Sequence, residues 1–493
     1  MTKNVVLINP PWYFSHPRER ILSQNLGLGY LAAVLVRDGH AVSVIDALAQ
    51  GIDCAQKIAG RYGEYYQIGV PLRRIVEQIP PQTELVGITA PFTNNGPIVR
   101  NLAREIKKSF PRVPIVLGGV YPSLTPQAAR CSEIDYYVIG EGELALRDLV
   151  NGRDPCQITG VYSSDPALPP RASAEVFQVL DEIPFPAREM FPMQVYLGQY
   201  SPRRRRSRTA SLITSRGCPF RCRFCSIHAV TGFGWRARSA VNVLAEISLL
   251  IEKYNIEHIE IEDDNFTLEK QRTMAIVDGI TRLNARGGNT VSWSLPNGVR
   301  VDTLDEALLR QIKNSNCVDL ALAVESGDPH VLAKMNKQLD LQKVLDVAKI
   351  CSRLGIPTSA FFMVGYPSET EGGFRKSMAF VKQLQGAGVG RFYATVSRAY
   401  PGTELFEECK AAGFLEEITD RENIFLANLI TRENSIETPD FTQQDVLRRM
   451  SIFERATVPW FLRWYHAFHY VIKKFIPDAV IQIIKRLFVR DRV

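Results

Sequence analysis

Three cysteines lie close together in the middle of the chain, on a loop that follows the apolar residues Leu212 and Ile213. Cys218, Cys222 and Cys225 have C-x3-C-x2-C spacing. Thiolates this close in sequence can bind one compact soft-metal centre. Three ligands leave one iron of a four-iron cluster open, and an open position lets a metal centre bind and activate a ligand. The alternative is a structural zinc site, for which His228 is available as a fourth ligand.

Polar residues follow the strands that we predict in the second half of the chain. These strands cover 212–214, 258–262, 291–295, 318–324, 358–364 and 392–396, and helical patterns separate them. A capping box at 303–306 is expected to open one of these helices. The order predicts a partial (βα)6 barrel over 209–401, whose functional residues lie at the carboxyl ends of the strands. Candidate cofactor-binding residues there are Glu262, Asp263, Asp264, Arg300, Glu325, Ser326, Gly365, Pro367 and Glu369.

A second set of alternating elements fills residues 1–150. Apolar strands are predicted over 5–8, 41–45, 85–89, 115–117 and 136–139, and helices over 29–37, 99–108 and 125–130, the last capped by Thr125. This order predicts a doubly wound parallel sheet, which binds ligands beyond the carboxyl ends of its strands. Candidate binding residues in the loops at those ends are Pro10, Trp12, Thr89, Thr93, Gly118, Gly119, Glu141 and Gly142.

The three-cysteine spacing resembles the cluster motif of the radical S-adenosylmethionine (SAM) enzymes. Arg216 and Gly217 before the first cysteine and Phe224 before the last strengthen the match. The resemblance implies a [4Fe-4S] cluster whose open iron takes the amino and carboxylate groups of SAM. In that family an electron from the cluster breaks SAM into methionine and a 5′-deoxyadenosyl radical.

The same resemblance assigns roles to the residues that follow the barrel strands. It implies that Glu325 is the carboxylate that binds the ribose of SAM. Residues 262–264 would meet the SAM amino group, and residues 365–369 would contact adenine and methionine. For any one of these residues the alternative is a helix cap or a partner of a helix dipole.

The N-terminal loops resemble the cobalamin-binding domain that precedes the barrel in one large branch of radical SAM enzymes. Thr89, Gly118 with Gly119, and residues 140–143 carry the match. The loop after the first strand reads Asn-Pro-Pro-Trp-Tyr-Phe-Ser-His and lacks the Asp-x-His-x-x-Gly motif of cobalamin-dependent mutases. The resemblance therefore implies cobalamin without a histidine lower ligand, with His16 as the one candidate nearby. The alternative is a degenerate domain that binds no cobalamin.

Two segments differ in composition from the α/β units. Residues 151–208 are rich in proline, which predicts an ordered linker without long helices. The basic run 203–206, with Arg208, indicates either a solvated face or an anion site for substrate or lipid phosphate. Residues 402–493 have mostly helical patterns, and aromatic and basic residues interleave after Pro459. That tail is typical of a membrane surface, and the alternative is a helical cap on the barrel.

The composition indicates a globular protein of a reducing compartment. The chain has 493 residues, of which 45% are apolar and 23% charged, and its nine cysteines show no secretory context. No apolar run reaches the roughly 18 residues that span a bilayer. The net charge of +7 is concentrated in the C-terminal tail, so it does not indicate a nucleic-acid partner. We expect a cytoplasmic protein, with the tail as a possible peripheral contact to the inner face of a membrane.

These features together predict an enzyme that uses a [4Fe-4S] cluster, SAM and cobalamin to methylate an unactivated carbon. The substrate would be a small molecule or lipid, and flavodoxin or ferredoxin would be the reductant. One alternative is ring closure or rearrangement, as in the anaerobic tetrapyrrole cyclase. Another is a cobalamin- or redox-sensing protein without turnover. The remaining cysteines lack metal spacing, which disfavours the transfer-RNA methylthiotransferases, since those carry a second three-cysteine cluster.

Overall fold

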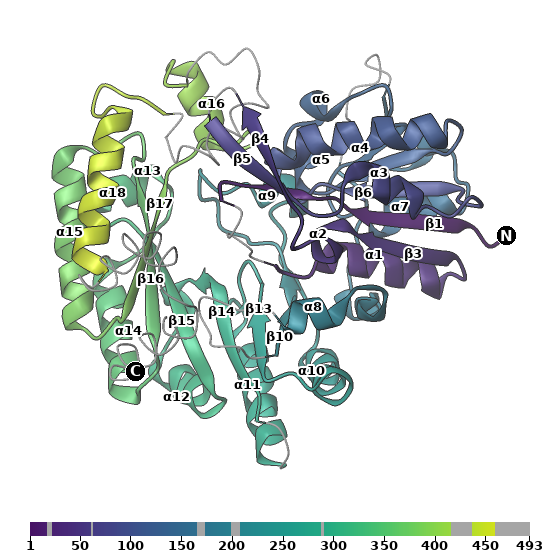
Figure 1. Ribbon diagram of the computed structural model, residues 1–493. Coiled ribbons are helices and arrows are strands. Elements are labelled where there is room, and N and C mark those ends of the chain that lie inside the picture. The colour runs from purple at the N-terminus through teal and green to yellow at the C-terminus, as the bar shows by residue number, and fades with distance from the viewer. Residues whose placement is uncertain are drawn as a thin grey trace, which may run out of the picture.

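The computed structural model of the chain describes residues 1–16, 22–60, 63–164, 173–198, 208–286, 290–415 and 436–458. It contains two α/β units side by side, followed by helices (Figure 1). This confirms the predicted fold class. The basic run 203–206 and the tail after Val458 lie outside the described residues. Within the described residues, no helix is long and apolar enough to cross a membrane.

The N-terminal unit is a six-stranded sheet in the order β3-β1-β6-β7-β8-β9. All neighbouring strands are parallel except β8 and β9. The central strands are buried on both faces, as the continuous apolar run of β1 requires. The strands are β1 (Asn4–Asn9), β3 (Ala41–Asp46), β6 (Leu85–Thr89), β7 (Ile115–Gly118), β8 (Tyr136–Val138) and β9 (Val161–Ser163). The helices are α1 (Leu26–Arg37), α2 (Ala47–Gln50), α3 (Leu72–Glu77), α4 (Gly96–Ser109), α5 (Val120–Leu124), α6 (Pro126–Ala129) and α7 (Glu143–Val150).

The structure differs from the predicted N-terminal unit in two places. A small antiparallel sheet was not predicted; it consists of β2 (Trp12–Phe14), β5 (Gly63–Ile68) and β4 (Ala55–Gly60). Strands β4 and β5 mix polar, charged and apolar residues without regular alternation, and β2 has only three residues, so the usual strand signal is weak. The helix predicted over 125–130 is shorter; Thr125 is its N-cap residue, as predicted, but its hydroxyl donates to the Tyr121 carbonyl (2.9 Å) and accepts no N–H of the helix.

The second unit is a sheet of six parallel strands in chain order, which forms the predicted partial barrel. Its strands are β10 (Thr209–Leu212), β13 (His258–Ile261), β14 (Ser292–Val299), β15 (Cys317–Glu325), β16 (Thr358–Val364) and β17 (Arg391–Val396). Its outer helices are α10 (Ala240–Tyr254), α11 (Lys270–Ala285), α12 (Glu306–Asn314), α14 (Leu341–Leu354) and α15 (Glu371–Gly386). Shorter elements at the carboxyl end are β11 (Ser215–Arg216), α9 (His228–Thr231), β12 (Arg236–Ala237) and α13 (Pro329–Lys334).

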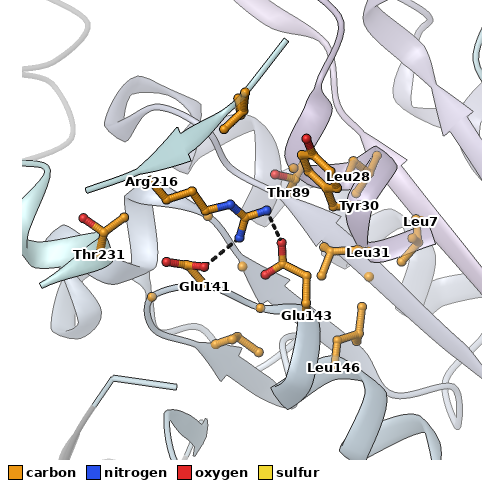
Figure 2. Close-up of a pocket in the computed structure, with 18 of the residues that line it drawn as sticks. Leu7, Leu28, Tyr30, Leu31, Thr89, Glu141, Glu143, Leu146, Arg216 and Thr231 are labelled. Atoms are coloured by element: carbon orange, nitrogen blue, oxygen red, sulfur yellow. Dashed lines mark hydrogen bonds and ion pairs between the residues drawn. The ribbon is translucent and has the colours of Figure 1, made fainter. Parts of the chain in front are cut away.

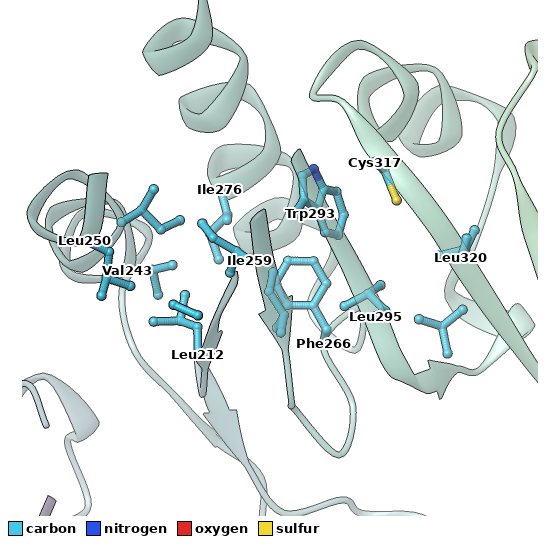
Figure 3. Packing of buried hydrophobic residues seen from close by; sticks show 14 of the residues in the cluster. Leu212, Val243, Leu250, Ile259, Phe266, Ile276, Trp293, Leu295, Cys317 and Leu320 are labelled. Carbon is cyan, nitrogen blue, oxygen red and sulfur yellow. The ribbon is translucent and has the colours of Figure 1, made fainter. Parts of the chain in front are cut away.

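Large apolar side chains fill the space between the barrel strands and the helices outside them (Figure 3). Trp293 is fully buried and packs against Phe266, with ring centroids 5.8 Å apart. Its indole N–H donates to the carbonyl of Ser315 (3.1 Å), so the buried donor has a partner. Cys317 and Cys351 are buried in the same core, in agreement with their predicted packing role.

The capping box predicted at 303–306 is wrong in one detail. Asp305 is the N-cap of α12, and its carboxylate accepts the N–H of Leu308 (2.9 Å). Thr303 belongs to the preceding 3₁₀ helix η5 (Val301–Thr303) and donates its hydroxyl to the carbonyl of Arg300 (2.8 Å). An aspartate three residues before a free N–H competes equally well for the cap position.

The linker contains short elements that contact both units. They are η2 (Pro155–Gln157), η3 (Leu180–Glu182), η4 (Arg188–Met190) and α8 (Met193–Leu197), and α8 packs between α2 and β10. Arg208 donates to the carbonyl of Tyr254 (2.8 Å), so this arginine caps α10. In the C-terminal region, α18 (Gln443–Thr457) packs against α15 and β17, and α16 (Glu404–Ala411) lies near the carboxyl end of the barrel (Figure 1).

Candidate functional site

The three candidate cluster cysteines lie on one loop at the carboxyl end of β10. All three thiols are free and partly exposed. Burial raises the pKa of the Cys225 thiol to about 11, and the neighbouring Cys222 and Cys218 add to that rise. The thiols are therefore close enough to influence one another, which suits ligands of a shared multi-iron centre.

Two aspartates after β13 hold this loop in place. The Asp263 carboxylate accepts the Thr214 N–H (2.6 Å), the Thr214 hydroxyl (2.5 Å) and the Ser215 hydroxyl (2.6 Å). Asp264 accepts the Gly217 N–H (2.9 Å). Burial raises the pKa of Asp263, against its hydrogen bonds, and burial raises the pKa of Asp264 to about 6. These predicted SAM-binding residues thus act first as the framework of the cysteine loop.

A segment after α13, residues 335–338, holds the other side of the loop. The Met335 carbonyl accepts the Arg223 N–H (3.0 Å), and the Asn336 side chain donates to the Arg221 carbonyl (2.8 Å). Arg300 donates to the carbonyl of Lys337 (3.1 Å), and its guanidinium lies 3.7 Å from the centre of the Phe220 ring. Arg300 therefore contacts the cysteine loop through a stacked aromatic ring.

Lys337 is a site residue that the sequence analysis missed. The residue is 5% exposed, and its ammonium pairs with Glu325 at 3.0 Å. Burial raises the pKa of the Cys222 thiol, whereas Lys337 and Arg300 lower it. Glu325 itself has φ of 67°, in the left-handed region. This conformation is costly for residues other than glycine, and such strained residues occur most often at functional sites. Its neighbour Ser326 is fully buried and bonds to Ser377 (3.2 Å).

The predicted SAM loop after β16 is closed by a buried glutamate. Glu369 accepts the N–H of Gly365 (2.9 Å), and Pro367 lies half-buried between them. Arg449 of α18 pairs with Glu369 (3.3 Å), and both side chains are 1% exposed. Burial raises the pKa of Glu369 to about 7, and the Gly365 N–H and Arg449 oppose that rise. No local sequence pattern indicates the role of Arg449, because it lies 80 residues from its partner Glu369.

The zinc alternative finds no support in the geometry around His228. Its Nδ1 lies 3.3 Å from the Gly232 carbonyl, and its ring stacks on Phe233 with centroids 4.3 Å apart. Across the described ranges, no three His, Cys, Asp or Glu side chains converge at the distances of a single metal ion. Sulfur ligands of a four-iron cluster need not converge in that way, because each binds a different iron.

A cavity of about 300 Å3 lies between the N-terminal sheet and the cysteine loop (Figure 2). The sheet contributes predicted residues at the carboxyl ends of its strands: Thr89, Gly118, Gly119, Glu141 and Gly142. The barrel contributes Arg216, Glu262 and Asp264. The cavity therefore joins the predicted cobalamin loops to the segment that carries the cysteines.

Three predicted cobalamin contacts are not part of this lining. Trp12 lies on β2, where its ring meets Phe92 edge-on at 5.1 Å. Thr93 is buried at the start of the 3₁₀ helix η1 (Thr93–Asn95), and Pro10 is buried after β1. Contact of Pro10, Trp12 and Thr93 with cobalamin remains a prediction.

The glycines at the end of β7 form a cradle that suits a bulky ligand. A Cβ on Gly118 would meet no atom closer than 3.9 Å, so this backbone faces open space. The described residues that line the cavity include no histidine, and cobalamin bound without a histidine lower ligand remains a prediction. The volume is at the lower end of the range for ligand pockets, so it would enclose part of a corrinoid. The residues present thus fit cobalamin.

Comparison with known proteins matches both units. The model of the Radical SAM superfamily matches residues 212–381, and that of the B12 binding domain matches residues 22–150. An uncharacterised methyltransferase of Pyrococcus horikoshii is 31% identical, over 79% of each chain. Cytidylyl-2-hydroxyethylphosphonate methyltransferase of Streptomyces wedmorensis is 27% identical over 84% of this chain and 83% of its own.

Solved structures show the same fold. The radical SAM methyltransferase TsrM from Kitasatospora setae, solved with tryptophan and a SAM analogue, aligns with a TM-score of 0.65 and 19% identity. The alignment covers 84% of this chain and 77% of that one.

The fold and the cysteine loop define a radical SAM enzyme. The chain belongs, more narrowly, to the radical SAM enzymes that carry a cobalamin-binding domain. The cofactors of that family are a [4Fe-4S] cluster, SAM and cobalamin.

Proposed function

We propose that this enzyme transfers a methyl group from SAM, by way of cobalamin, to an unactivated carbon of a small molecule. The observation that carries the proposal is the cavity in which the glycine loops of the cobalamin-binding unit face the cysteine loop. The methyltransferase relatives that match along most of the chain support the same activity. A sensor without turnover would have no use for a second, fully built cofactor site beside the first.

The chain's own residues bind and position the cofactors in this proposal. Cys218, Cys222 and Cys225 hold the cluster, while Glu325 and the loop closed by Glu369 bind SAM. When bound, the cluster supplies an electron for SAM cleavage and cobalamin carries the methyl group. The loops after β6, β7 and β8 hold the corrinoid against the barrel and exclude water from the space between the cofactors.

The substrate and reductant are further parts of the proposal. The substrate would be a small molecule or a lipid. Flavodoxin or ferredoxin would supply the electron. A contact between the C-terminal tail and a membrane concerns residues outside those that the structure describes.

The two uses of SAM give the proposal a stoichiometric test. One SAM donates its methyl group and leaves S-adenosylhomocysteine, and the other is reductively cleaved and leaves 5′-deoxyadenosine with a hydrogen from the substrate. With substrate, reconstituted enzyme should form both by-products in about equal amounts, and methyl-deuterated SAM should label the product. Mass spectrometry measures all three.

The control is the Cys222→Ala variant, which should lose iron and 5′-deoxyadenosine together. Product formed with 5′-deoxyadenosine but with only background S-adenosylhomocysteine would reject methyl transfer. That result would favour cyclisation or rearrangement, since neither needs a methyl donor.

A further inference from the structure

Arg216 reaches from the cysteine loop into the cobalamin-binding unit. It lies on β11, two residues before Cys218. Its Nη1 donates to Glu141 (2.6 Å) and its Nη2 donates to Glu143 (2.8 Å), as Figure 2 shows. Glu141 lies in the loop after β8 and Glu143 is the first residue of α7, so one guanidinium bridges two carboxylates of the other unit.

A second arginine closes the same network. Arg236 of β12, which pairs with Arg216 in the two-stranded sheet, also donates to Glu141 and to the Phe177 carbonyl (2.6 Å). We call the group Arg216, Arg236, Glu141 and Glu143 the interdomain clamp. Its arginine side chains are 13% exposed and its glutamates 7%, and its two positive and two negative charges balance.

The clamp makes the shape of one loop depend on the other. Buried carboxylates are costly without a partner, so Glu143 depends on Arg216, whereas Glu141 would keep Arg236 as its remaining partner. The backbones also touch: a Cβ on Gly140 would lie 3.2 Å from the Val230 carbonyl of α9. Glu141 and Gly142 line the cavity. A cysteine loop held in one conformation therefore also holds this part of the cavity wall in one conformation.

We propose that Arg216 is a positioning residue that couples cluster assembly to cobalamin binding. A bound cluster fixes residues 218–225 and with them the adjacent arginine, so the cavity wall is already ordered when cobalamin arrives. Coupling through shared order is reciprocal, so each cofactor raises the affinity for the other by the same factor. The inference rests on the proposed function only in taking cobalamin as the occupant of the cavity.

The test compares hydroxocobalamin affinity with and without the cluster. The full-length protein with its reconstituted cluster is titrated beside the cluster-free Cys222→Ala variant, and bound corrinoid is followed by absorbance. The cluster should tighten binding at least about fivefold, the lower end of typical coupling factors. The measured quantity is the ratio of the two hydroxocobalamin dissociation constants, without the cluster over with the cluster. In Arg216→Met, compared with and without reconstitution, this ratio should fall to near one. Arg216→Lys keeps the positive charge but cannot donate to both glutamates with a planar guanidinium, so its ratio should lie between those of Arg216→Met and the wild type.

Two further variants separate the clamp from general damage. Glu143→Gln alters the clamp from the cobalamin-binding side and should also reduce the ratio while its iron content stays normal. Arg223→Met is the matched control, because Arg223 lies in the same loop but pairs with Glu408 (2.5 Å) and Glu404 (3.6 Å) of α16, outside the cobalamin-binding unit. Its ratio should stay at the wild-type value.

The outcomes distinguish this inference from the proposed function. Equal hydroxocobalamin affinity with and without the cluster would overturn the coupling but leave the cavity assignment intact. An affinity ratio that falls as far in Arg223→Met as in Arg216→Met would also overturn the coupling, since the effect would then not depend on the clamp. If no form of the protein binds hydroxocobalamin, the assignment of the cavity itself is wrong.

Discussion

Gly118 and Gly119 are neighbours at the end of β7, but their backbones have different requirements. Gly119 has φ of 104°, and a Cβ there would lie 2.7 Å from the Ala90 carbonyl. Gly118 has an ordinary backbone and open space where a side chain would be. The fold therefore requires glycine at position 119. At position 118 the fold does not require glycine, and its absent side chain leaves space for the ligand.

We expect Gly118→Val to weaken hydroxocobalamin binding by tenfold or more, because the new side chain occupies the cavity. The free energy of unfolding should change by less than about 0.5 kcal/mol, as for a substitution without new strain. Absorbance titration and urea denaturation measure the two quantities.

Gly119→Ala is the informative contrast, since it should cost on the order of 1 to 3 kcal/mol of stability through backbone strain. Normal cobalamin affinity in Gly118→Val would mean that the corrinoid does not approach β7.

At the scale of elements, α18 closes the barrel from outside and also reaches the predicted SAM loop. Its Arg449 donates to the Glu369 carbonyl (3.0 Å) as well as to the carboxylate, and lies between the rings of Phe374 and Phe441. Arg448, the next residue, is half exposed and pairs with Glu371 (2.7 Å) on the surface. Two adjacent arginines of one helix thus have very different environments.

Arg449→Met should weaken SAM binding about tenfold, because an unpaired Glu369 takes up a proton and holds Gly365 less well. It should also lower the free energy of unfolding by on the order of 3 kcal/mol, the cost of breaking a buried pair. Equilibrium dialysis of SAM against the cluster-loaded enzyme measures the first effect.

Arg448→Met provides the control for the same helix, with a stability loss below about 1 kcal/mol and unchanged SAM affinity. If Arg449→Met loses stability but binds SAM normally, the loop over 365–369 does not contact SAM.

For the whole molecule, a buried network around Arg188 joins the two units through the linker. Arg188 donates to Gln24 (2.6 Å) of the N-terminal unit, and to the Ser211 carbonyl (2.8 Å) and Glu246 (2.8 Å) of the barrel. Glu246 also pairs with Arg238 at 2.6 Å. The linker is therefore an internal part of the interface and not a flexible tether.

Removing this arginine should destabilise the chain as a whole. Arg188→Met leaves the fully buried Glu246 with one partner fewer, at an expected cost on the order of 3 kcal/mol. Urea denaturation of the cofactor-free protein measures the loss.

Lys253→Met is the matched control for Arg188→Met. Lys253 of α10 and Glu189 of the linker join the same two segments, but by an exposed ion pair at 3.5 Å. That variant should lose less than about 1 kcal/mol. Equal losses in the two variants would show that burial of the Arg188 network adds nothing to stability.

Much of the fold could be predicted because its signals are local. Short apolar runs of three to seven residues identified the parallel strands, and glycine pairs and polar residues marked their carboxyl ends. The parts that were missed lack such signals: β4 and β5 mix polar and apolar residues, and the cap of α12 had two candidates two residues apart, Thr303 and Asp305.

The sequence by itself determined the spacing of the three cysteines, the order of the two α/β units and the absence of the histidine motif for a lower cobalt ligand. Those features depend on residue type and short spacing, which the chain carries before it folds. Only the tertiary structure decided that Asp263 holds the cysteine loop, that Lys337 pairs with Glu325, and that Arg216 bridges two glutamates of the other unit. Such pairings leave no local pattern, because they are made by residues 12 to 75 positions apart that the crossing of elements brings together.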